Sequence, residues 1–321
     1  MNHKLLSVVT HCYNEEENVE EVYQQIKSVF DGLSGYSYEH IFIDNASSDS
    51  TVAILKGIAS KDTSVKIIIN TRNFGHIRSP YHAMMQAKGD AVISIVADLQ
   101  DPPEVIADFV NKWEEGYKLV IGVKTKSEES FLFFGIRKFY YYLINKLSDT
   151  ELVKNFTGFG LYDREVINAL KKINDTYPYL RGLISELGYD LAKIEYEQPL
   201  RKKGLTKNNF YTLYDMAMLG FTSHSKVPLR LATFTGFLVS LISIFVGIFY
   251  FIYKLMFFER FDVGIAPLVV GLFFFGAVQL FFIGIIGEYI GSIHTQVLKR
   301  PLVIEKERVN FDPEIIDSNE K

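Results

Sequence analysis

Cysteine, tryptophan and an excess of either charge are scarce in this sequence. The single cysteine, Cys12, excludes an internal disulfide framework and a cysteine-based zinc site, and it suits a reducing compartment or the cytosolic side of a membrane. The 34 Lys and Arg against 38 Asp and Glu give a formal net charge of −4, so we expect no nucleic-acid binding through a globally basic surface. A Gly-rich phosphate loop of the dinucleotide or P-loop type is also missing, which argues against NAD enzymes and P-loop ATPases.

Charge is entirely missing from two long segments in the last third of the chain. Residues 231–253 and 263–287 contain no Asp, Glu, Lys or Arg, and about 20 consecutive apolar residues are enough to span a bilayer. Buried helices of a soluble protein have the same composition, but a chain of 321 residues could not surround two of them. The sequence therefore predicts a transmembrane hairpin within residues 226–290.

Basic residues lie mostly outside this hairpin, on both of its sides. By the positive-inside rule, the long N-terminal region and the tail at residues 291–321 are expected in the cytoplasm. The apolar run at residues 5–10 is too short for a signal peptide. We therefore expect a multi-pass protein of the inner (cytoplasmic) membrane with both termini cytoplasmic. The basic residues are Arg201, Lys202, Lys203, Lys207, Lys226 and Arg230 before the hairpin and Lys299, Arg300, Lys306 and Arg308 after it.

The first 125 residues alternate short β-branched runs with helical patterns. Helices are expected to begin at Asn14, at Asp49 or Ser50, and at Ser79, with the last one ending at Gly89, because capping residues flank apolar side chains at helical spacing. This alternation predicts an α/β domain with a mostly parallel sheet that is covered on both faces. The strands are expected at residues 5–10, 38–44, 65–70, 91–96 and 119–123.

Polar clusters follow four of these strands. Each cluster alone could be an ordinary strand-to-helix loop, since Asp, Asn and Ser are common caps and turn formers. Four clusters on one edge of a sheet indicate a binding site more strongly, because ligands gather at the carboxyl ends of parallel strands. The clusters are residues 10–16 (THCYNEE), 44–49 (DNASSD), 71–76 (TRNFGH) and 97–103 (ADLQDPP).

In this order the clusters resemble the family 2 glycosyltransferases, and most of all the polyprenyl-phosphate branch with dolichyl-phosphate mannose synthase and bactoprenol glucosyltransferase. Residues 225–233 and 276–301 resemble the two-span membrane anchor of the bactoprenol enzymes, so the resemblance covers residues 5–304. It implies a GT-A (Rossmann-like) nucleotide-sugar domain at residues 1–225. Such a domain moves a sugar from a nucleotide diphosphate, here expected to be UDP, to a membrane polyprenyl phosphate with inversion of the anomeric carbon.

The resemblance also implies roles for individual residues. Asp44 stands where the family recognises the nucleoside, and Asp98 with Gln100 stands where Mg²⁺ or Mn²⁺ is held beside the diphosphate. The expected catalytic residues are Asp98, Gln100 and Asp101. The expected donor contacts are Tyr13, Asn14, Glu15, Asp44, Ser47, Asp49, Arg72 and His76. The expected ligands of the acceptor phosphate are Lys124, Arg137, Arg201 and Lys207, unless these cations only attract anionic headgroups.

Four positions depart from the family pattern. Val96 replaces the first Asp of the Asp-x-Asp pair, which should weaken metal binding, although Mg²⁺ commonly uses one or two carboxylates with substrate phosphates and waters. Asn45 replaces a frequent second Asp. Gly158 and Gly160 stand where relatives often have Asp and Arg, and that Asp is sometimes assigned as the base. A phosphate acceptor is largely deprotonated at neutral pH and can attack without a general base. The loss of this Asp therefore fits a lipid-phosphate acceptor, and it fits an inactive domain equally well.

Two stretches that combine aromatic and basic residues, 131–147 and 210–223, predict amphipathic helices in the membrane interface. Helices packed on the sheet are the alternative interpretation of both. An interfacial position would bring the catalytic loops close to a phosphate at headgroup depth.

Two hypotheses about function follow. The first is a membrane-anchored hexosyltransferase, expected to be a homo-oligomer, that makes a polyprenyl-phosphate sugar for cell-surface glycan assembly or modification. The second is a catalytically degenerate protein that binds a nucleotide sugar or a lipid carrier for a partner. A polymerising synthase is disfavoured, because the chain has one tryptophan, Trp113, no Gln-x-x-Arg-Trp segment, and too few spans for a polymer channel.

Overall fold

The computed structural model describes residues 3–125, 153, 155–199, 218, 219, 222, 225–257 and 265–312. The chain divides into two compact units, which we call the sheet unit and the helical unit. The sheet unit comprises Met1–Tyr141, Thr150–Asn209 and Leu298–Lys321, and the helical unit comprises Tyr142–Asp149 and Phe210–Val297. The tail after the second long helix therefore belongs to the same unit as the N-terminal region.

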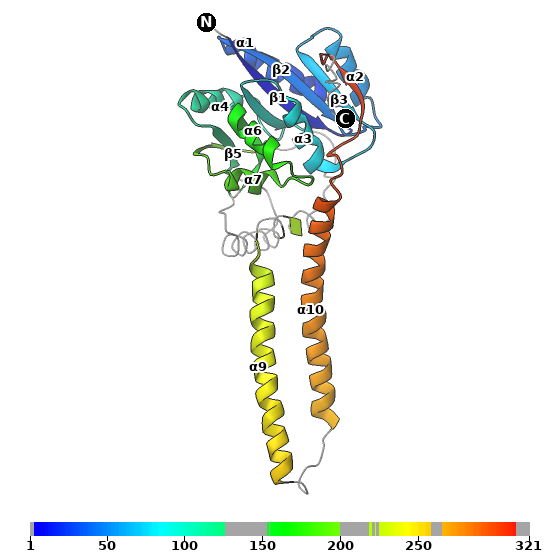
Figure 1. The fold of residues 1–321 in the computed structure, drawn as a ribbon. Helices are drawn as coiled ribbons and strands as arrows, with labels where there is room; N and C mark the ends of the chain where they lie inside the picture. Colours follow the sequence, from blue (N-terminus) through cyan, green and yellow to red (C-terminus); the bar gives the residue numbers. More distant parts are fainter. Residues whose placement is uncertain are drawn as a thin grey trace, which may run out of the picture. The chain divides into compact units, whose positions relative to one another are not determined.

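Within the described residues, one eight-stranded sheet forms the centre of the sheet unit, with the strand order β7-β5-β6-β4-β1-β2-β3-β8 (Figure 1). β1 pairs in parallel with β2 and β4, and β2 pairs in parallel with β3. The carboxyl ends of these four strands therefore share one edge of the sheet. β6 and β8 run antiparallel to their neighbours. The strands are β1 (Lys4–Cys12), β2 (Tyr36–Asp44), β3 (Val65–Asn70), β4 (Ala91–Val96), β5 (Leu119–Lys124), β6 (Phe156–Asp163), β7 (Leu191–Tyr196) and β8 (Glu305–Val309).

Helices cover both faces of the sheet, and alternate side chains of each strand reach one face or the other. Leu6 and Val8 of β1 belong to the apolar cluster that includes α1, α2 and α4, whereas Val9 belongs to the cluster that includes α3, α6 and α7. The α/β class with a sheet buried on both faces is thereby confirmed. The helices are α1 (Val19–Gly32), α2 (Thr51–Ala59), α3 (Gly75–Gln86), α4 (Val105–Glu114), α6 (Arg164–Ile173) and α7 (Leu180–Glu186).

Two helices begin at residues other than those the sequence predicts. α1 begins at Val19, because Asn14 has a left-handed backbone (φ 53°) and its side-chain oxygen accepts from the Ser48 N–H (2.8 Å) instead of capping a helix. α3 begins at Gly75 and contains Pro80 in its interior. The proline lacks an N–H and so removes one helical hydrogen bond, but it does not stop the helix here.

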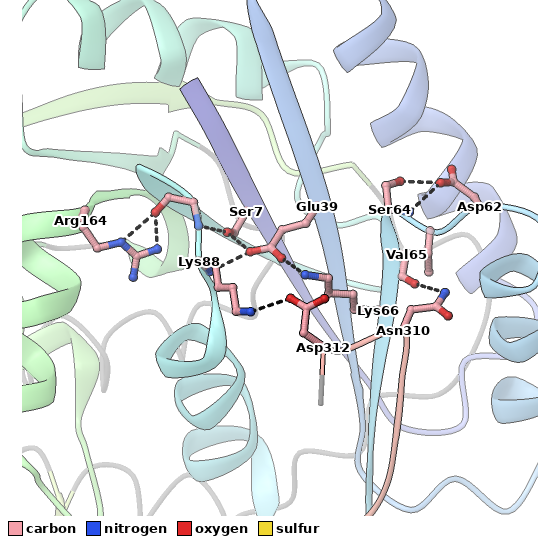
Figure 2. Close-up of polar contacts among 11 residues, drawn as sticks. Ser7, Glu39, Asp62, Ser64, Val65, Lys66, Lys88, Arg164, Asn310 and Asp312 are labelled. Atoms are coloured by element: carbon pink, nitrogen blue, oxygen red, sulfur yellow. Dashed lines mark hydrogen bonds and ion pairs between the residues drawn. The ribbon is translucent and has the colours of Figure 1, made fainter. Parts of the chain in front are cut away.

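A buried carboxylate ties three parallel strands together (Figure 2). Glu39 of β2 is 3% exposed and accepts from Ser7 Oγ of β1 (2.5 Å), Lys66 Nζ of β3 (2.5 Å) and the Lys88 N–H (2.7 Å). Burial acts to raise the pKa of Glu39, but these partners outweigh it and the pKa is lowered. Next in the chain, the Gly89 N–H donates to Ser7 Oγ (2.8 Å), and a Cβ on Gly89 would lie 2.7 Å from the Ser7 nitrogen. Only glycine allows this close approach.

The tail adds β8 to the outer side of β3, an element that the sequence did not predict. Hydrogen bonds and ion pairs fix the tail between Ile304 and Asp312, and Figure 2 shows those of Asn310 and Asp312. The sheet is therefore completed by residues that follow both apolar helices in the chain. The contacts join the Thr71 N–H to the Ile304 carbonyl (2.9 Å), His82 Nε2 to Glu305 (2.5 Å), Lys56 to Glu307 (2.7 Å), Asn310 to the Val65 carbonyl (2.9 Å) and Lys88 to Asp312 (2.8 Å).

Two long apolar helices, α9 (Val227–Met256) and α10 (Ile265–Val297), dominate the helical unit. Their segments Val227–Tyr253 and Gly271–Val297 have mean hydropathies of 2.3 and 1.8, and both are long and apolar enough to cross a membrane. Large apolar side chains on both are exposed, which is unfavourable in water. α10 continues ten residues beyond the predicted end of the second span at residue 287, because helical hydrogen bonding persists after the hydropathy falls.

Candidate active site

Asp44 ends β2 at the carboxyl edge of the sheet and is fully buried. Its oxygens accept from the N–H (2.9 Å) and the hydroxyl (2.5 Å) of Ser47, and that hydroxyl accepts from the Asn14 N–H (2.8 Å). Burial raises the pKa of Asp44, and the hydrogen bonds from Ser47 act in the opposite direction. Tyr13, partly buried, precedes Asn14 in the same loop. The loops after β1 and β2 are thus joined around one buried carboxylate.

Asp49 and Glu15 hold the same two loops together. Asp49 Oδ1 accepts from the Thr51 N–H (3.0 Å) at the start of α2, and Oδ2 accepts from the Glu16 N–H (3.3 Å). The Glu15 N–H donates to Thr51 Oγ1 (2.9 Å), and its carboxylate accepts from Asn18 Nδ2 (2.6 Å). Burial acts to raise the pKa of Asp49, but its hydrogen bonds outweigh burial and the pKa is lowered. The predicted donor residues of both loops lie together. Many of their polar groups are used in hydrogen bonds that hold the loops in shape.

Asn45 connects the loop after β2 to the loop after β3, a role that sequence reasoning missed. Its amide nitrogen donates to Asn73 Oδ1 (2.9 Å) and the Gly75 carbonyl (3.2 Å). Its amide oxygen accepts from the Phe74 N–H (2.9 Å) and from Asn70 Nδ2 (3.2 Å). A carboxylate could not donate to either of the first two partners. An Asn at this position therefore does more than lower the negative charge of the site, because its amide nitrogen joins the two loops.

The loop after β3 brings Arg72 and His76 to the same edge. Arg72 is exposed, and its guanidinium carbon lies 4.0 Å from the centroid of the Phe74 ring. His76 lies in the first turn of α3, and its pKa is lowered first by desolvation and then by Arg181 of α7. Both predicted donor residues of this loop are exposed to a ligand, and both offer hydrogen-bond donors to an anion.

The loop after β4 contains all three predicted catalytic residues. The Gln100 N–H donates to Asp98 Oδ1 (3.1 Å) across Leu99, whose backbone is left-handed (φ 59°). Asp101 is 3% exposed and accepts from the Tyr196 hydroxyl of β7 (2.7 Å). Burial raises the pKa of Asp101 to about 6. Asp98 is therefore partly exposed at the edge of the sheet, whereas the buried Asp101 holds the loop to β7 through Tyr196.

Lys124 is the one predicted acceptor-phosphate ligand within the described part of the chain. Its ammonium acts to lower the pKa of Asp101, while the charge of Asp98 acts to raise it, so the end of β5 and the loop after β4 interact. Lys124 thus lies near the predicted catalytic residues. The remaining predicted ligands, Arg137, Arg201 and Lys207, the stretch 131–147 and most of the stretch 210–223 lie outside the described residues.

His11 lies next to Val96, which stands in the place of the missing carboxylate, and sequence reasoning assigned no role to His11. His11 of β1 is the register partner of Val96 of β4, so the two side chains lie on the same face of the sheet. Its Nδ1 is buried and has no hydrogen-bond partner among the residues described. Burial, followed by His76, lowers the pKa of His11 to about 4. A neutral imidazole with an unused nitrogen therefore borders the position of the absent Asp, an adjacency that only the strand order reveals.

The two glycines of β6 are required by the local backbone. A Cβ on Gly160 would lie 2.5 Å from the Val120 carbonyl oxygen of β5, so no larger residue fits without a backbone shift. Gly158 has φ 109°, where other residues are strained, and its carbonyl accepts from the Tyr162 hydroxyl (2.8 Å). The departures from the family pattern at both positions are therefore compatible with an intact fold.

The donor set at Asp98 fits a divalent cation that arrives with a substrate. The described residues contain no group of three or more His, Cys, Asp or Glu side chains placed to hold a metal. Mg²⁺ is commonly held by one or two carboxylates together with phosphate oxygens and waters. The carboxylate of Asp98 and the amide oxygen of Gln100 provide hard oxygen ligands of this kind.

The polar loops after β1, β2, β3 and β4 therefore share one edge of the sheet. The model of the family described as Glycosyl transferase family 2 matches residues 7–171, and the chain belongs to this family. It is 36% identical over 303 residues to the uncharacterized glycosyltransferase YkcC of Bacillus subtilis (strain 168), covering 94% of this chain and 93% of that protein. The chain is an enzyme of the glycosyltransferase class.

Two further similarities concern a curated relative and a solved structure. The SfII prophage-derived bactoprenol glucosyl transferase of Shigella flexneri is 35% identical over 309 residues, covering 96% of this chain and 99% of that protein. Glucosyl-3-phosphoglycerate synthase from Mycobacterium tuberculosis, crystallised with Mn²⁺, UDP and phosphoglyceric acid, is 20% identical with a TM-score of 0.49. The match covers 68% of this chain and 76% of that one.

Proposed function

We propose that the chain transfers a sugar from UDP to a membrane polyprenyl phosphate and inverts the anomeric carbon. The observation that carries this proposal is a sheet edge with Asp44 and Asp98 in a chain that also has two helices long and apolar enough for a bilayer. Relatives that match almost the full chain are named bactoprenol glucosyl transferases, and bactoprenol is a polyprenyl carrier. UDP is favoured because the buried acceptor oxygens of Asp44 suit the imide N–H of uracil.

The chemistry requires one bond to form and one to break. An oxygen of the acceptor phosphate attacks the anomeric carbon, and the bond from that carbon to the β-phosphate oxygen breaks, so that UDP leaves with the electron pair. The phosphate needs no base, since its second pKa is about 6 and it is largely deprotonated at pH 7. The side chains of Arg72 and His76 bind the diphosphate, and Lys124 binds the acceptor phosphate. A Mg²⁺ or Mn²⁺ ion held by Asp98 and Gln100 would supply positive charge to the leaving group.

The same proposal fixes the orientation in the membrane. The sheet unit contains both the N-terminal region and the tail, which supports a location of the two on one side of the bilayer, and the excess of Lys and Arg outside the hairpin favours the cytoplasmic side. The product is then a polyprenyl-phosphate sugar on the cytoplasmic leaflet of the inner membrane. We further propose a homo-oligomer, and chemical cross-linking of the full chain in membranes tests that state separately.

A transfer assay tests the proposal and separates it from a binding protein. The purified full chain in an uncharged detergent is given a panel of labelled UDP-sugars, polyprenyl phosphate and Mn²⁺ or Mg²⁺, and the lipid fraction is analysed by mass spectrometry. We expect a lipid-linked phosphosugar with one member of the panel. Saturable UDP-sugar binding without a lipid-linked product across the panel would instead support the degenerate carrier protein, which the replacement of the first Asp by Val96 favours.

A further inference from the structure

Two arginine side chains converge on one fixed aromatic ring in the sheet unit. The guanidinium carbons of Arg72 and Arg78 lie 4.0 and 5.8 Å from the centroid of the Phe74 ring. Phe74 is 8% exposed, and its N–H donates to Asn45 Oδ1, so the ring has a defined position. The ring favours each cation through its π-face, but it supplies no negative charge.

A third arginine comes from the tail. Arg78 Nη2 donates to the Pro301 carbonyl (2.5 Å), which brings the neighbouring Arg300 into the same cluster. Burial lowers the pKa of Arg78, and the charges of Arg72 and Arg300 lower it further. No carboxylate among the described residues acts on Arg78 in the opposite direction, and its Nε is buried without a hydrogen-bond partner. Three guanidinium groups therefore lie close together with no carboxylate beside Arg78 among the described residues, and their fork geometry matches the oxygens of a phosphate.

The covalent chain limits where this cluster can lie. Arg300 is three residues beyond Val297, the last residue of α10, so extended chain can place it at most about 11 Å from the end of that helix. If α10 spans a bilayer, as the proposed function requires, Arg300 is a juxtamembrane arginine, and such arginines attract the phosphates of anionic lipids. Arg78 of α3 is hydrogen-bonded to the very next residue, Pro301, so Arg78 and Arg300 lie close together.

We propose that Arg78 and Arg300, bordered by Arg72, form a binding site for the phosphate of an anionic phospholipid headgroup. The site goes beyond sugar transfer, because it binds a lipid that is neither donor nor acceptor and requires no turnover. Its ligand is an anionic lipid and not a zwitterionic one, since the cluster has three positive charges and would repel a choline group.

The test uses the full chain in phosphate-free dodecyl maltoside. Dihexanoylphosphatidylglycerol, dihexanoylphosphatidylcholine and inorganic phosphate are each titrated, and the concentration dependence of the apparent melting temperature gives the affinity. We expect the phosphatidylglycerol to half-saturate at about a 10-fold lower concentration than the phosphatidylcholine, because the choline cation is repelled by the arginine cluster while both lipids offer the same phosphate oxygens. Inorganic phosphate should produce no saturation in the same range.

Two variants and one control keep the result interpretable. Arg300→Gln leaves the hydrogen bond from Arg78 to Pro301 intact, and Arg78→Gln removes it, and each should weaken phosphatidylglycerol binding about 10-fold. Lys61→Gln removes an exposed cation elsewhere on the sheet unit and should change nothing. Equal affinity of wild type and both variants would overturn the proposal, as would saturation by inorganic phosphate at the same concentration as the lipid. A loss of UDP affinity in Arg300→Gln without a loss of lipid affinity would assign the cluster to the donor site instead.

Discussion

The acidic loops after β1 and β2 and the arginine cluster formed by α3 and the tail balance their charges differently. Asp44 and Asp49 both accept hydrogen bonds from neighbouring backbone and hydroxyl groups, so the acidic loops are satisfied within the protein. Arg78 and Arg300 form a cluster with like charges and no carboxylate within the described residues. The first region is therefore arranged before a ligand arrives, whereas the second gains its counter-charge only when an anion binds.

The largest test of this comparison concerns the acidic side. Asp98→Asn removes a negative charge that a divalent cation needs, so we expect kcat to fall by about 10²–10³, the loss typical of one removed electrostatic stabiliser. Product formation by the full chain with its preferred UDP-sugar is the measurement. Asp108→Asn, an exposed aspartate on α4, is the matched control and should keep wild-type kcat. Unchanged turnover in Asp98→Asn would show that the assigned cation position is wrong.

The second test breaks the link between the two regions. Asn45→Asp removes both donors to Asn73 and Gly75 and buries a carboxylate, so we expect a destabilisation of about 3 kcal/mol. The apparent melting temperature of the full chain in detergent is the measurement. Asn111→Asp makes the same chemical change on the exposed face of α4 and should shift the melting temperature much less. Equal shifts of the melting temperature in both variants would refute the role of Asn45 in joining the loop after β2 to the loop after β3.

The third test concerns the tail that carries Arg300. Burial acts to raise the pKa of Glu305, but His82 and Arg308 outweigh it and lower the pKa to about 2. The stabilisation is therefore present above the unfolded value of about 4.3 and is lost as the pH falls from there towards 2. We expect Glu305→Gln to destabilise the β8 pairing by about 2 kcal/mol at pH 7.

Amide hydrogen exchange of β8 measures this effect as a function of pH. The exchange rates of wild type and Glu305→Gln should converge as the pH falls below 4. Glu307→Gln, on the same strand, removes an exposed ion pair with Lys56 and should cost less than about 0.5 kcal/mol. A difference between wild type and Glu305→Gln that persists at pH 2 would contradict the assigned ion pair.

The smallest expected effect sharpens the acidic side. Val96→Asp restores a second carboxylate beside Asp98 at a partly exposed position, so we expect the half-saturating Mn²⁺ concentration for turnover to fall about 10-fold. Steady-state rates over a Mn²⁺ titration are the measurement. Val123→Asp adds the same charge at another partly buried strand position and serves as the control. An unchanged half-saturating Mn²⁺ concentration in Val96→Asp would contradict this expectation and would indicate that His11 already supplies a metal ligand beside Asp98.

Local signals in the sequence were sufficient for much of the fold. The strands at residues 65–70 and 91–96 have the predicted bounds, and α2 begins directly after Ser50, because β-branched runs and helix caps act over a few residues. The parallel edge and its polar loops followed from the same alternation. The left-handed Asn14 was not predictable, since its partner Ser48 lies in another loop.

The remaining features depend on contacts between distant segments. β8 has the sequence EKERV, whose charges do not resemble a strand, and it becomes one by pairing with β3. The adjacency of His11 and Val96 requires the order of β1 and β4, which the βαβ pattern alone does not give. The hydrogen bonds of Asn45 likewise require the loop after β3 to lie beside the end of β2. Sequence reasoning found the site residues but could not assign these partners.

The position of β8 in the chain has a consequence for biosynthesis. The ribosome makes residues 305–309 only after α9 and α10, so under the membrane-anchored function proposed above both apolar helices enter the bilayer while the outer edge of β3 is still open. That edge contains Ile67, Ile68 and Ile69 and is a template for wrong pairing with another nascent chain. Maturation of the catalytic sheet is therefore coupled to membrane insertion, and premature termination just after α10 should yield protein that is inserted but prone to aggregate.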